Sequence, residues 1–138
     1  MKHREILILF CITFIVAMSG AACSQSQAQN ITYDPSKSYA AFLVVNSEYG
    51  KDSLVSMRAR SLQEGYEIGP IEPYNPGIKD FEPILRRLTS SKQVKIVWII
   101  SSYLDVPDIK KAQAKIDYTG AYRYVPISDQ TGPMKITQ

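Results

Sequence analysis

The hydrophobic pattern of the chain is organised around residues 94–101, the longest apolar and β-branched run after the N-terminal segment. A strand with one face in water alternates apolar and polar residues, whereas only Lys95 interrupts this run, near its start. Such a run is typical of a strand covered on both faces, as in a parallel sheet between helices. Residues 38–45 form a second, nearly continuous apolar run and predict a second buried strand.

Two further segments predict strands at the edges of the sheet. Residues 66–71 contain Gly69 and Pro70, which would interrupt a central ladder of hydrogen bonds. Residues 121–127 alternate in polarity and contain Pro126, so they also suit an edge strand.

Helical patterns separate these strands. The first helix is expected to follow a cap at Asp52 or Ser53 and to end at Gly65. Its expected buried face consists of Val55, Ala59 and Leu62, at spacings of four and three.

A second helix is predicted to begin near Asp80, with Pro83 in its first turn. Its expected buried stripe consists of Phe81, Ile84, Leu85 and Leu88. Asp105 is a good N-cap for a third helix, and Asp108 completes a pattern like a capping box. The apolar face of that helix consists of Val106, Ile109, Ala112 and Ile116.

The order of elements is therefore β-α-β-α-β-α-β, which predicts an α/β fold. The two most apolar strands should be central and the two proline-bearing strands peripheral. With right-handed crossovers, strand order 2-1-3-4 meets both requirements. We expect a small three-layer sandwich with a four-stranded, mostly parallel sheet, a minimal flavodoxin-like or Rossmann-like arrangement, over residues 38–128.

The first 22 residues have the order of an export signal. Lys2 and Arg4 precede an uncharged apolar run over residues 6–18, and small residues follow. Thirteen apolar residues are too few for a membrane span, which needs about 20. A retained N-terminal anchor is the alternative interpretation.

Cys23 follows Gly20-Ala21-Ala22, which resembles a bacterial lipobox and implies a lipidated cysteine as first residue of the mature chain. The large aliphatic residue usual three places earlier is Gly20 here. Residues 23–37 would form a flexible tether. The competing interpretation is ordinary cleavage after Ala28, which would give a soluble secreted or periplasmic protein.

With lipidation, the expected location is the periplasmic face of a bacterial membrane. Ser24 beside the cysteine is not an acidic retention signal, which favours the outer membrane. Residues 129–138 would form a C-terminal tail.

Composition excludes several classes of function. A net charge of +3 gives no reason to expect nucleic acid as a partner. His3 is the only histidine and lies in the predicted signal, so the mature chain has no imidazole for a Ser-His-Asp triad or a metal site. No phosphate-binding glycine motif is present, and we predict no cofactor and no metal.

Two polar loops follow the two buried strands. Because strand order reverses between these strands, the loops should meet in a crevice at the carboxyl edge of the sheet. The first loop enters a helix N-terminus, whose unpaired amides can hold an anion. The candidate ligand or partner crevice consists of Asn46, Ser47, Glu48, Tyr49, Lys51, Ser101, Ser102 and Tyr103.

Two other sets of residues have alternative interpretations. Glu48, Asp105 and Asp129 could supply carboxylate chemistry at the same edge, although capping explains Asp105 and a turn explains Asp129. Tyr122 and Tyr124 could form a partner surface, because tyrosine is enriched at interfaces, or could pack across an edge strand.

The first hypothesis is an exported lipoprotein whose domain binds another envelope protein without catalysis. The alternative is a small-ligand-binding protein or carboxylate-dependent hydrolase that uses the crevice.

Overall fold

The computed structural model describes residues 30–127, in which strands and helices alternate strictly. The strands are β1 (Tyr39–Val45), β2 (Glu67–Tyr74), β3 (Val94–Ser102) and β4 (Ala121–Ile127), and the helices are α1 (Glu48–Gln63), α2 (Glu82–Leu88) and α3 (Val106–Gln113). The predicted signal, Cys23 and the predicted tail from 129 lie outside the described residues.

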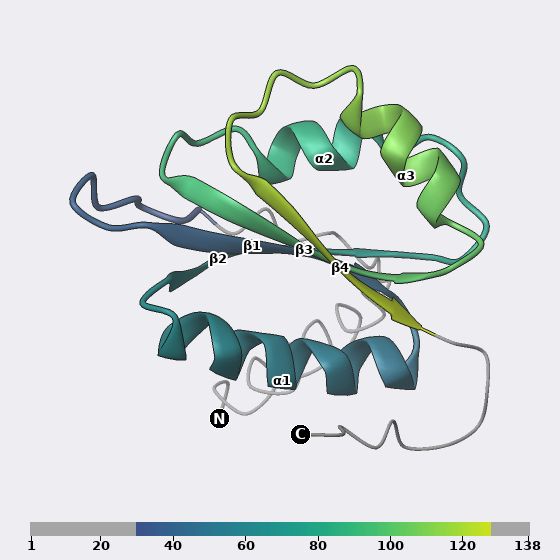
Figure 1. Ribbon diagram of the computed structural model, residues 1–138, viewed down its shortest axis with the longest axis horizontal. Coiled ribbons are helices and arrows are strands. Elements are labelled where there is room, and N and C mark those ends of the chain that lie inside the picture. The colour runs from purple at the N-terminus through teal and green to yellow at the C-terminus, as the bar shows by residue number, and fades with distance from the viewer. Residues whose placement is uncertain (1–29, 128–138) are drawn as a thin grey trace, which may run out of the picture.

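The four strands form one sheet in the order β2-β1-β3-β4, and every neighbouring pair is parallel. Helix α1 covers one face of this sheet, and α2 and α3 cover the other (Figure 1). The predicted α/β three-layer fold and strand order are therefore confirmed, and the sheet is parallel throughout.

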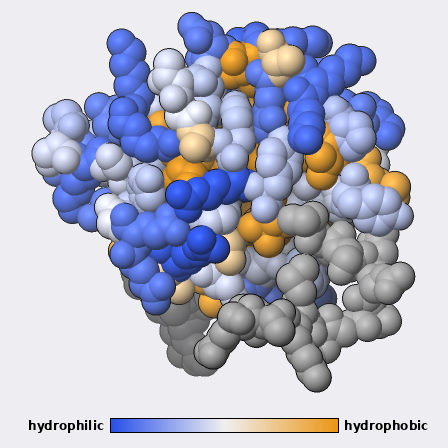
Figure 2. All heavy atoms as spheres, viewed as in Figure 1, coloured by the Kyte–Doolittle hydropathy of each residue, from blue (hydrophilic) through white to orange (hydrophobic). Residues whose placement is uncertain are grey.

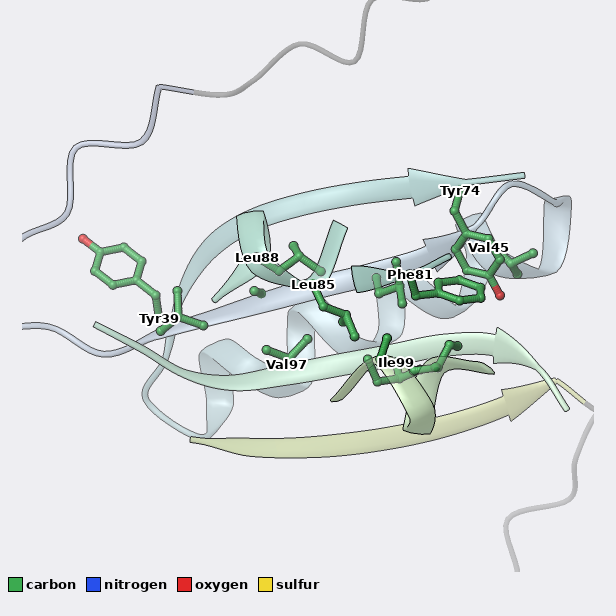
Figure 3. Packing of buried hydrophobic residues seen from close by; sticks show 13 residues of the cluster. Tyr39, Val45, Tyr74, Phe81, Leu85, Leu88, Val97 and Ile99 are labelled. Carbon is green, nitrogen blue, oxygen red and sulfur yellow. The ribbon is translucent and has the colours of Figure 1, made fainter. Parts of the chain in front are cut away.

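The two central strands contribute side chains to two separate cores, because successive side chains of a strand point to opposite faces of the sheet. Leu43 and Ile99 belong to one cluster with Phe81, Leu85 and Leu88, and all five are fully buried. Figure 3 shows Ile99 on the same side of the sheet as Phe81 and Leu85. Phe42 and Trp98 lie on the other face, with Leu54 and Met57 of α1 packed against them. Both central strands are thus covered on both faces, as the continuous apolar runs predicted.

The predicted buried face of α1 is wrong. Val55 and Leu62 are 68% and 55% exposed, whereas Leu54, Met57 and Ser61 face the sheet. The helix also begins earlier than predicted, because Ser47 caps it: Ser47 Oγ accepts a hydrogen bond from the Gly50 amide at 3.1 Å.

The reason for this error is that the sheet-facing side of α1 is made partly of small residues. Gly50 packs directly on the Val45 carbonyl, where a Cβ atom would clash. A pattern search for large apolar residues therefore selects the solvent-facing ridge. Gly65, with φ +86°, ends the helix region as predicted.

Strand β2 is longer than predicted, since it continues through Pro73 to Tyr74. It tolerates its prolines because it lies at the edge of the sheet, where an amide on the outer side has no ladder partner to lose.

Candidate functional site

The loops that follow β1 and β3 leave the same edge of the sheet. The two strands are adjacent, with Val44 paired to Ile100, so Asn46 and Ser102 emerge at neighbouring positions. The chain moves outward from β1 to β2 in one direction and from β3 to β4 in the other. The predicted change of direction between β1 and β3 is therefore present at this carboxyl edge.

The polar residues of the first loop are mostly engaged with their own neighbours. The hydroxyl of Ser47 caps α1, and Asn46 Nδ2 donates to Asn75 Oδ1 at 3.0 Å. Lys51 and Glu48 form an exposed ion pair at 2.9 Å. This loop therefore holds the start of α1 in place and links it to the end of β2.

The second loop differs in character. Ser101 is fully buried, and its Oγ has no hydrogen-bond partner. Ser102 Oγ accepts from the Leu104 amide at 3.3 Å. Tyr103 and Leu104, by contrast, extend into solvent, with 55% and 63% of their surfaces exposed.

A buried pair that sequence reasoning missed lies beneath these loops. Tyr74 Oη donates to Asp105 Oδ2 at 2.8 Å, and both residues are more than nine-tenths buried. Burial raises the pKa of Tyr74, and the hydrogen bond to Asp105 adds to this. The backbone of Ser102 and the hydroxyl of Ser101 lie close to the phenol, and both lower the pKa of Tyr74.

This pair corrects the predicted role of Asp105. Its side chain makes no capping hydrogen bond to α3, although it stands at the N-cap position. It instead ties α3 to the end of β2, across 31 residues of sequence. No local pattern signals such a contact, because a capping aspartate and a phenol-binding aspartate look alike in sequence.

The two candidate tyrosines of β4 lie against the core. Tyr122 and Tyr124 are partly buried over the cluster that α2 and α3 cover, and Tyr124 Oη donates to Gln113 Oε1 at 2.6 Å. Burial, together with neighbouring Tyr124, raises the pKa of Tyr122 to about 12. Only part of each ring is therefore open to a partner.

Exposed apolar side chains concentrate instead at the carboxyl edge and along α1. Tyr49, 44% exposed, stands in the first turn of α1, and Tyr103 and Leu104 lie in the loop after β3, so all three are at the carboxyl edge of the sheet. On the face with β4 in front, hydrophobic surface appears as small areas between hydrophilic side chains (Figure 2). We call Tyr49, Tyr103 and Leu104 the edge patch.

The described residues offer little for metal or covalent chemistry. Within residues 30–127, no three His, Cys, Asp or Glu side chains lie together in a way that would hold a metal ion. Of the three candidate carboxylates, Glu48 is exposed and paired, Asp105 is buried against Tyr74, and Asp129 lies outside the described residues. No helix within residues 30–127 is both long and apolar enough to cross a bilayer.

Comparison with known proteins adds no relative. No protein-family model matches the chain, and no curated protein matches it significantly.

Proposed function

We propose that this protein is an exported bacterial lipoprotein, anchored through Cys23, whose α/β domain binds another envelope protein without catalysing a reaction. The observation that carries the proposal is the edge patch: three large apolar side chains, 44–63% exposed, in the first turn of α1 and in the loop after β3, both at the carboxyl edge of the sheet. Exposed aromatic and large apolar residues on loops of a rigid scaffold are typical of protein-binding sites.

The direction of the strands supports this arrangement. The N-terminal segment joins the domain at Tyr39, whose amide donates to the Gln93 carbonyl at the amino edge of the sheet. All strands run the same way, so the carboxyl edge lies a full strand away, roughly 20 Å for the seven residues of β1. An anchor before residue 30 would join the domain at the edge of the sheet opposite the edge patch, which would leave the patch accessible to a partner.

Three polar side chains at the carboxyl edge already have structural partners, which supports a binding role over a catalytic one. Ser47 caps a helix, Glu48 is neutralised by Lys51, and Asp105 is buried against a phenol. Each has a structural partner, and residues 30–127 contain no histidine that could serve as its base.

The partner surface is tested by replacing Tyr103 and Leu104 with serine in the full chain and capturing bound protein from envelope extract by cross-linking. We expect the captured partner to be lost, with the melting temperature unchanged because both side chains are exposed. The control is the pair Val55→Ser and Leu62→Ser, two equally exposed apolar residues on α1. Loss of the partner in the control pair alone would move the binding surface to α1 and contradict the proposal.

The anchor is tested separately with Cys23→Ser and metabolic labelling by a fatty acid. The unchanged chain should carry the label and fractionate with membranes, and the variant should lose both properties. A mature chain that begins at Gln29 and fractionates as a soluble protein would instead establish cleavage after Ala28.

One observation favours the alternative, a small-ligand site in the crevice. Ser101, a candidate crevice residue, lies close to the buried pair of Tyr74 and Asp105, so polar groups from three segments gather at this edge. A thermal-shift screen of small anions and nucleotides distinguishes the two functions. A ligand that raises the melting temperature of the unchanged protein but not of Ser101→Ala would favour the ligand site.

A further inference from the structure

A hollow of about 430 Å³ lies at the amino edge of the sheet, opposite the edge patch. Its volume falls within the range usual for small-molecule sites. It is formed by the loop that connects α2 to β3 and the loop that connects α3 to β4. Its lining consists of Thr89, Ser90, Ser91, Lys92, Val94, Lys95, Asp117, Tyr118 and Thr119.

The charge in this hollow is unbalanced. Lys92 and Lys95 are both exposed, and neither forms an ion pair within residues 30–127. Asp117 is the only acidic residue in the lining, so the lining carries one net positive charge. An anion is therefore the ligand that this set of side chains favours.

A second hollow, about 210 Å³ in volume, is lined by Lys79, Lys111 and Lys115 together with Asp80 and Asp108, so its lining also carries one net positive charge. Lys79 is paired with Asp108 at 3.2 Å and Lys115 with Glu82 at 3.3 Å. In the amino-edge hollow neither lysine has such a partner within residues 30–127, so both remain available to one anion.

The hollow also lies beside the point where the chain enters the domain. In the loop from α2 to β3, the Gln93 carbonyl accepts a hydrogen bond from the Tyr39 amide. The rings of Tyr33 and Tyr39, 5.0 Å apart between centroids, hold the preceding residues against the domain. Figure 1 shows that β1 begins on the same side of the sheet as this loop. If Cys23 is lipidated as proposed above, only residues 24–29 separate it from the described chain, a reach of about 20 Å when extended.

We propose that the amino-edge hollow binds a phosphate group through Lys92 and Lys95. Two sources could supply this phosphate group: a phospholipid headgroup or a free phosphate compound. The assignment to a lipid headgroup rests on the proposed lipid anchor, which would keep the hollow near the membrane surface. The phosphate site itself does not depend on that anchor. Bound headgroups would orient the domain with the edge patch away from the bilayer.

The first test measures binding of inorganic phosphate to the full chain by titration calorimetry, with the double variant Lys92→Gln and Lys95→Gln. We expect the dissociation constant to rise about tenfold or more in this variant, because each lysine contributes attraction to the anion. The matched control is Lys110→Gln with Lys111→Gln, the same loss of charge from exposed lysines on α3. Melting temperatures verify that all variants are folded.

The second test asks for the source of the phosphate group. The full chain with Cys23→Ser, which removes the acyl chain, is floated with phosphatidylglycerol vesicles, with and without the two lysine substitutions at the hollow. Flotation that depends on Lys92 and Lys95 assigns a lipid headgroup. Phosphate binding without flotation assigns a free phosphate compound.

Two results would overturn the site: no phosphate binding by the unchanged chain, or equal weakening in the control variant, which would reveal unspecific attraction to surface charge. Neither result bears on lipidation of Cys23 or on the edge patch. Conversely, a chain that is not lipidated leaves the phosphate titration fully interpretable.

Discussion

At the scale of single residues, the indole of Trp98 shows how polar groups fix a buried aromatic ring. Trp98 is 3% exposed, and its Nε1 donates to Ser61 Oγ at 2.9 Å. The guanidinium carbons of Arg60 and Arg123 lie 5.4 and 5.2 Å from the ring centroid, and Glu64 pairs with both arginines. These two arginines lower the pKa of the Glu64 carboxyl.

The substitution Ser61→Ala tests this contact. It leaves the buried indole N–H without an acceptor, and we expect the free energy of unfolding to fall by about 1–3 kcal/mol. Urea denaturation followed by tryptophan fluorescence measures the change. Ser56→Ala on the exposed side of the same helix is the control and should change stability by less than about 0.5 kcal/mol. Equal stabilities of the two variants would mean that the hydrogen bond contributes nothing.

At the scale of elements, α1 shows that an apolar residue on a helix is not always a buried one. Leu54 packs against the core around Trp98, while its neighbour Val55, at 68%, is the most exposed large apolar residue within residues 30–127. Two adjacent positions on one helix therefore have opposite environments, although both residues are apolar.

The pair Leu54→Ala and Val55→Ala tests that assignment. Leu54→Ala removes a partly buried side chain and should lower the free energy of unfolding by about 1–2 kcal/mol. Val55→Ala should be neutral or slightly stabilising, since it removes a β-branched residue from an exposed helix position. Thermal denaturation of both variants measures the difference, and a larger loss for Val55→Ala would restore the originally predicted buried face.

At the scale of the whole molecule, buried and partly buried phenols make stability fall at alkaline pH. The pKa values of Tyr74, Tyr118 and Tyr122 are raised, mainly by burial, and that of Tyr122 reaches about 12. Unfolded tyrosine titrates near roughly pH 10, so above that pH the unfolded chain releases protons that the folded chain retains. Stability should therefore be unaffected by these groups below pH 10 and fall as the pH rises further.

Tyr122→Phe isolates one of these groups. Its hydroxyl is buried without a hydrogen-bond partner, so the variant should be at least as stable as the unchanged chain at pH 8. Above pH 10 its stability should decline less steeply, because one of the raised groups is gone. Urea midpoints at pH 8, 10 and 11 measure both effects. Parallel declines would show that ionisation of Tyr122 is not linked to unfolding.

The sequence by itself determined the architecture. Apolar runs at residues 38–45 and 94–101 require cover on both faces, and prolines in the outer segments exclude those segments from the centre, so strand order 2-1-3-4 meets both requirements. It also located the two loops at the carboxyl edge, because parallel strands end on the same side.

Only the tertiary structure decided which side chains of those elements meet. The buried side of α1 depends on the close contact of Gly50 with Val45, and the role of Asp105 depends on Tyr74, 31 residues earlier. The amino-edge hollow likewise joins two loops that are distant in sequence. Hydrophobic periodicity predicts how much of an element is buried. Contacts between side chains that are distant in sequence form only when the sheet brings their elements together, so a local pattern cannot predict them.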